Sequence, residues 1–140
     1  MFNVPSTFKV FPFHILDHKM YNRKGWGHGK IMFSRDCYSI VYDGYSIIFS
    51  LLQLACYMGF KEICLLGCDC NYDSGRRHFI EYEPVKYDTS IETASERLIR
   101  IHGEFKKFAD SIGVKVINCT RGGMLEVYPR KSLEAVLSKD

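Results

Sequence analysis

The chain has 140 residues, of which 46% are hydrophobic and 25% are charged, with a formal net charge of +3. This length is typical of one domain, so we expect a single α/β domain over residues 1–140. The charge is too small to favour binding to nucleic acid. No apolar run approaches the ~18 residues of a membrane-spanning helix, so any membrane contact would be peripheral.

The cysteine pattern indicates the compartment. None of the six cysteines forms a CxxC pair, and no Cys/His group has the spacing of a zinc finger. The amino terminus shows no secretory signal. We therefore expect reduced thiols in a cytoplasmic protein, at most peripheral at the inner face of the membrane.

The first thirty residues carry the weakest pattern, and we leave residues 1–30 poorly defined. Within the first third of the chain we expect short strands at residues 9–16, 30–33 and 37–42. A helix follows over residues 45–58. Its polar residues fall three or four apart in one narrow stripe on an otherwise apolar cylinder, which predicts a largely buried helix. These polar residues are Ser46, Ser50, Gln53 and Tyr57.

Gly59 suits the position just past the end of that helix. Residues 63–67 form a continuous apolar run, which is typical of a parallel strand covered on both faces. A long polar loop, residues 71–88, comes next, and loops of this length are often functional.

A second helix is predicted from a capping box at Thr89 and Glu92 to a stop at Gly113. Its apolar positions alternate three and four apart, and we place His102 on its surface. A strand at residues 114–118 and a short helix at residues 130–137 complete the chain. This order predicts a three-layer Rossmann-like open sheet, mostly parallel, with helices on both faces.

Ligands of such sheets bind outside the carboxyl ends of the strands, so the candidate residues are expected there. The turn before the first helix, Gly44, Tyr45 and Ser46, offers backbone N–H groups to an anion. The alternative is that Asp43 or Ser46 only caps the helix. Asp69 follows a buried strand and is a candidate catalytic carboxylate; alternatively it only accepts hydrogen bonds from its own loop.

The loop after Asp69 supplies the next candidates. Arg76 and Arg77 can bind phosphate through paired hydrogen bonds. His78 can act as a general base near neutral pH. The alternative is a solvated loop without a special role.

Asn118 ends the last strand on the same predicted edge and is followed by a TRGG turn; alternatively this segment is a simple glycine turn. No pattern of metal ligands is visible. We therefore assign no metal site and expect no cofactor.

Three stretches carry a further signal: DGYSIIFSLLQLACYMGFKEICLLGCDCNY, the HF pair at residues 78–79, and INCTRGGMLEVYPRKSLEAVL. Together they resemble the carboxyl-terminal half of the 6-hydroxymethylpterin diphosphokinase-like family. The fold of that family is related to bacterial sialyltransferases and Maf-type glycosyltransferases. The resemblance covers about residues 40–137. The Gly-Asn-Gly-type loop of the family's amino-terminal half is missing here.

The resemblance implies roles for the candidate residues. Gly44, Tyr45 and Ser46 would contact a nucleotide-sugar donor, and Asn71 and Tyr72 would line its pocket beside Asp69. The resemblance also implies that the loop histidine, His78, is the general base. Arg76 and Arg77 would offset the charge on the donor phosphate.

The sequence thus predicts a sialyltransferase-like glycosyltransferase in surface polysaccharide assembly. Its partners would be a nucleotide-sugar donor, with a CMP-sugar favoured, and a glycan or glycolipid acceptor. A homo-oligomer or a partner chain would supply the missing half. Two alternatives stay open: a Mg²⁺-dependent diphosphokinase acting on a pterin-like alcohol with ATP, and a non-catalytic ligand-binding fragment of this fold.

Overall fold

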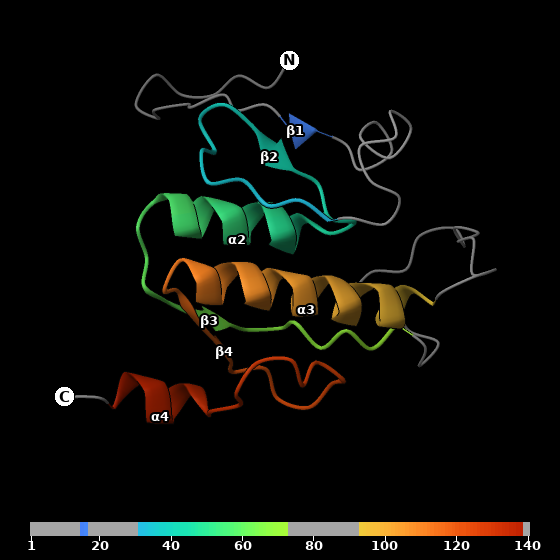
Figure 1. Ribbon diagram of the computed structural model, residues 1–140. Helices are drawn as coiled ribbons and strands as arrows, with labels where there is room; N and C mark the ends of the chain where they lie inside the picture. The colour runs from blue at the N-terminus through green and yellow to red at the C-terminus, as the bar shows by residue number, and fades with distance from the viewer. Residues whose placement is uncertain (1–14, 17–30, 73–92, 139–140) are drawn as a thin grey trace, which may run out of the picture.

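A computed structural model describes residues 15–16, 31–72 and 93–138 of the chain (Figure 1). These residues form helices and short parallel strands in an α/β arrangement. In chain order the elements are β1 (Ile15–Leu16), β2 (Val41–Tyr42), α2 (Ile47–Tyr57), β3 (Glu62–Leu65), α3 (Ala94–Ser111), β4 (Lys115–Asn118) and α4 (Leu133–Leu137).

The strands pair in parallel, as the sequence predicts. β1 pairs with β2, and β3 pairs with β4 in a register that runs from Glu62 opposite Lys115 to Leu65 opposite Asn118. An isolated parallel bridge joins Asn118 to Arg130. The described strands thus form two separate pairs, and the single three-layer sheet stays a prediction.

The two long helices lie between the two pairs of strands. Figure 1 shows α2 on the side of β1 and β2, α3 between α2 and β3–β4, and α4 at the far end. α2 contacts β2, and α3 contacts β4. In the described part of the chain, none of the helices combines the length and the apolar character needed to cross a lipid bilayer.

The prediction of a largely buried helix is wrong for α2, because apolar side chains on its outer face are exposed while Ser50 and Gln53 of the polar stripe are buried. Gln53 is fully buried, whereas Ile47 is 68% exposed and Leu51 is 51% exposed. The Gln53 amide explains this orientation. Its Oε1 accepts from the backbone N–H groups of Ser34 (2.9 Å) and Tyr42 (3.1 Å), and its Nε2 donates to the Tyr42 carbonyl (2.7 Å).

The buried apolar face of α3 and its carboxyl-terminal end match the prediction, but the helix starts later than predicted. Its capping box is formed by Thr93 and Glu96, so the helix begins at Ala94. The predicted box at residues 89 and 92 lies outside the described residues. The helix ends at Ser111, before Gly113 with φ of +69°, which confirms the glycine stop.

His102 is buried, so its predicted surface position is wrong. It lies four residues after Leu98 on the apolar face of α3, and its ring centroid is 4.7 Å from that of Phe49. Nδ1 of the imidazole is 3.0 Å from the hydroxyl of Tyr128. The same hydroxyl donates a hydrogen bond to the backbone carbonyl of His102 (3.2 Å). Burial lowers the pKa of His102 to about 4.

The predicted strand at residues 30–33 is wrong, because residues 31–33 form no strand, and the one predicted at 37–42 shrinks to β2 because the chain turns at residues 36–40. The ends of the later elements differ from the prediction by a few residues. β3 stops at Leu65, and the next residue, Leu66, is exposed rather than covered on both sides. α4 begins only at Leu133, because Arg130 forms the bridge to β4 and Ser132 caps the helix. All six cysteines are free thiols, as predicted.

Candidate functional site

The loops that follow β3 and β4 are joined by hydrogen bonds. The backbone N–H of Cys68 donates to Oγ1 of Thr120 (3.0 Å), and the backbone N–H of Met124 donates to the carbonyl of Asp69 (2.7 Å). Because β3 and β4 are parallel, both loops leave the sheet at the same edge. The structure therefore brings Asp69 and the turn after Asn118 together, as the sequence predicts.

Gly123 sets how closely these loops approach. A Cβ atom at this position would lie 2.6 Å from both the Cα and the carbonyl oxygen of Asp69, and φ of Gly123 is +81°. Both the contact and the backbone angle exclude larger residues. The second glycine of the TRGG turn is thus required for the geometry of the site.

The first turn of α3 connects the turn before α2 to the β3 loop. The guanidinium carbon of Arg97 lies 5.1 Å from the centroid of the Tyr45 ring, a cation–π contact. Oγ of Ser95 accepts a hydrogen bond from the backbone N–H of Tyr72 (3.0 Å). Tyr45 and Tyr72 therefore lie at the same end of α3.

The turn before α2 has a constrained backbone. Tyr45 has φ of +71°, which is unusual for a residue with a side chain. A Cβ atom on Gly44 would lie 2.9 Å from Cγ of Phe49. Ser46 occupies the N-cap position of α2 but makes no side-chain capping bond. The alternative, that the Ser46 hydroxyl caps the helix, is therefore wrong.

Asp69 and its neighbours occupy the rim of the site. Asp69 and Asn71 are exposed, and Tyr72 is half-buried. Oδ1 of Asp69 accepts a long hydrogen bond from the backbone N–H of Asn71 (3.3 Å). The carboxylate thus accepts a hydrogen bond within its own loop, as the alternative to a catalytic role predicted. The catalytic role of Asp69 stays a prediction.

Asn118 organises the loop that follows it. Its buried side chain donates from Nδ2 to the carbonyl of Leu125 (2.7 Å) and accepts at Oδ1 from the backbone N–H of Thr120 (3.0 Å). Both polar atoms of the amide therefore have protein partners. The predicted contact of Asn118 with a donor stays a prediction. Arg76, Arg77 and His78 lie outside the described residues.

A hollow of about 570 Å³ opens at the carboxyl end of β4. The β3 loop, the TRGG turn and the start of α4 form its walls. Three cations and one carboxylate are among its lining residues: Arg121, Arg130, Lys131 and Glu134. The last three were missed at the sequence level, although PRKS lies only five residues after the glycine turn.

Arg130 supports the wall of this hollow. Its guanidinium donates from Nη1 to the carbonyl of Thr120 (2.8 Å) and from Nε to Oε1 of Glu126 (2.8 Å). Nη2 also lies within 3.4 Å of the carbonyls of Gly123 and Leu125. The hydrogen bonds of the Arg130 side chain therefore stabilise the loop.

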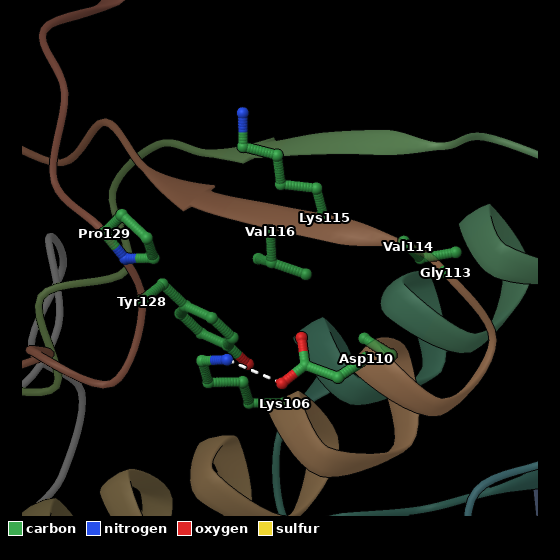
Figure 2. Close-up of a pocket in the computed structure, with 9 residues that line it drawn as sticks. Lys106, Asp110, Gly113, Val114, Lys115, Val116, Tyr128 and Pro129 are labelled. Atoms are coloured by element: carbon green, nitrogen blue, oxygen red, sulfur yellow. Dashed lines mark hydrogen bonds and ion pairs between the residues drawn. The ribbon is translucent and has the colours of Figure 1, made fainter.

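A second, smaller hollow of about 260 Å³ lies at the opposite end of β4 (Figure 2). It lies between the last turns of α3 and the amino end of β4. Nζ of Lys106 is paired with Oδ2 of Asp110 at 2.6 Å on one side of it. Of the predicted site residues that the structure describes, none lines it.

Within the described residues, no three His, Cys, Asp or Glu side chains gather as a metal site would require. Comparison of the chain with protein-family models, curated proteins and solved structures finds no match. We therefore argue function from the chemistry of the site.

Proposed function

We propose that the protein is a sialyltransferase-like glycosyltransferase that uses a nucleotide-sugar donor, with a CMP-sugar favoured. One observation carries the proposal: the two strand-end loops are hydrogen-bonded to each other, and the first turn of α3 joins the β3 loop to the turn before α2. Parallel α/β proteins bind nucleotides at this edge. The resemblance of residues 40–137 to the sialyltransferase-related family points to the same chemistry.

The reaction would be a displacement at the anomeric carbon of the donor. His78 would remove the proton from an acceptor hydroxyl as its oxygen forms the new bond to that carbon. The bond from the anomeric carbon to the donor phosphate would break, and the phosphate would leave with the electron pair. Arg76 and Arg77 would stabilise its charge.

The remaining residues would position the two substrates. Tyr45, Ser46 and the backbone of Gly44 would contact the donor, and Asp69 would orient the acceptor hydroxyl. We propose that β3 and β4 belong to a three-layer Rossmann-like sheet and that the protein acts at the cytoplasmic face of a membrane. A second copy or a partner chain would complete the donor site.

A non-catalytic ligand-binding role is the second candidate. It is favoured by the local hydrogen bonds of Asp69 and Asn118, which account for both side chains without a substrate. In that case the fold would bind a nucleotide or glycan without transferring a sugar.

Turnover of a CMP-sugar separates these two candidates. We expect the protein to release CMP in the presence of a glycan acceptor, and His78→Ala to lower kcat by about 100-fold or more, as for loss of a general base. His28→Ala serves as a matched histidine control and should keep full activity. If the protein binds the CMP-sugar but does not release CMP from it, the result would contradict the glycosyltransferase and favour a non-catalytic binding role.

A further inference from the structure

The hollow at the carboxyl end of β4 carries an excess of positive charge. Among the described residues, Arg121, Arg130 and Lys131 line it together with the carboxylate of Glu134, and Arg130 is ion-paired with Glu126 beside it, so the excess is about one positive charge. A concave surface with one sign of charge raises the local concentration of ions of the opposite sign. Its charge therefore favours an anionic ligand.

Two of the three cations are available to a ligand. Arg130 is committed to the loop carbonyls, but Arg121 is 93% exposed, and its Nη2 lies 3.4 Å from Oε1 of Glu134. That distance exceeds the roughly 2.7–2.9 Å of a strong charge-assisted hydrogen bond. Lys131 is exposed and has no carboxylate partner among the residues described.

Uncharged donors lie beside these cations. In the described part of the chain, the backbone N–H groups of Arg121 and Gly122 have no protein acceptor. Oγ1 of Thr120 accepts from the backbone N–H of Cys68, which leaves its own hydrogen for donation. Glycine turns with positive φ, here +73° at Gly122, often expose N–H groups to anions.

We propose that this hollow is a phosphate-binding site in which Arg121 and Lys131 bind the phosphate oxygens. Arg121, Lys131, Thr120 and the loop amides offer more donors than a carboxylate accepts, and they suit the oxygens of a phosphate. The volume of about 570 Å³ leaves room for the group esterified to that phosphate. Assigning the ester to a nucleotide donor rests on the proposed function.

A substitution at Glu134 can distinguish binding at this site from nonspecific attraction to the positively charged surface. Its carboxylate lies beside Arg121 and repels a bound anion, so it weakens phosphate binding. Replacing Glu134 with glutamine should therefore strengthen phosphate binding, whereas removal of either cation should weaken it.

Calorimetric titration of the full chain with inorganic pyrophosphate tests the site. We expect Arg121→Gln and Lys131→Gln each to weaken binding by about 10-fold or more, as for loss of a hydrogen bond to a charged group. Glu134→Gln should bind a few-fold more tightly. Lys115→Gln is the matched control, because this exposed lysine lies at the opposite end of β4.

Each outcome decides one claim. Equal weakening in all three lysine and arginine variants, or no pyrophosphate binding by the unaltered chain, would refute the phosphate site. Binding of N-acetylneuraminate but not of pyrophosphate would also refute it, because the ligand would then be a carboxylate. Pyrophosphate binding with the expected pattern, but no tighter binding of CMP or CDP, would uphold the site and refute the nucleotide donor.

Discussion

Acidification should destabilise the protein through the buried histidine. In the folded state the pKa of His102 is about 4, compared with about 6.5 for an exposed histidine, because burial disfavours the charged imidazolium. Between these two values the unfolded chain binds a proton that the folded chain does not. The contribution of His102 to stability is therefore complete above pH 6.5 and is lost as the pH falls toward 4.

The size of this effect follows from the two pKa values. A difference of about 2.5 units corresponds to about 3 kcal/mol at pH 4 and to about 2 kcal/mol at pH 5. This is a large share of the roughly 5–15 kcal/mol that stabilises a typical domain. Acid should therefore weaken the fold well before most carboxylates are protonated.

Urea unfolding from pH 7.5 to pH 4.5 measures this loss. We compare the unaltered chain with His102→Gln, which can still bond to Tyr128 but does not titrate. The free energy of unfolding should fall more steeply with acid in the unaltered chain, by about 2 kcal/mol at pH 5. Parallel curves for the two proteins, or an NMR titration of His102 with a midpoint near 6.5, would refute the reasoning.

Two further substitutions test the packing that forms the site. Gly123→Ala should destabilise the protein by more than Gly122→Ala, because both glycines have positive φ but only the former meets the backbone of Asp69. Equal losses on urea unfolding would show that this close approach does not matter. Gln53→Leu should cost about 3 kcal/mol or more, since it leaves buried backbone groups of the preceding segment unpaired. The exposed control, Leu51→Gln, should change stability by less than about 0.5 kcal/mol; a similar change in both variants would contradict the role of Gln53.

Local patterns predicted the helices and parallel strands because those signals lie within a few residues of one another. The three-and-four spacing of apolar residues in α3 and Gly113 at its end are examples. The errors come from partners far apart in the sequence. His102 is buried by Tyr128, which lies 26 residues away, and Gln53 turns inward to bond to the backbone of Ser34 and Tyr42.

The same reason explains which parts of the candidate site could be predicted. Asp69 and the glycine turn could be placed at one edge because each directly follows a strand of a parallel pair. Arg130 and Lys131 could not, because the loop after β4 returns to pair Arg130 with Asn118. That return is fixed by the guanidinium of Arg130 and the amide of Asn118, and neither contact has a local sequence signature.

Nucleotide binding is the most direct test of the proposed function. We would measure the thermal shift of the chain with CMP, CDP, UDP, GDP and ATP, each with and without Mg²⁺. A ligand at about 100 times its dissociation constant stabilises the folded state by about 2.7 kcal/mol. The proposal predicts a shift with CMP that does not depend on Mg²⁺. A shift only with ATP and Mg²⁺ would contradict it in favour of a diphosphokinase, and no shift with any nucleotide would contradict donor binding by this chain.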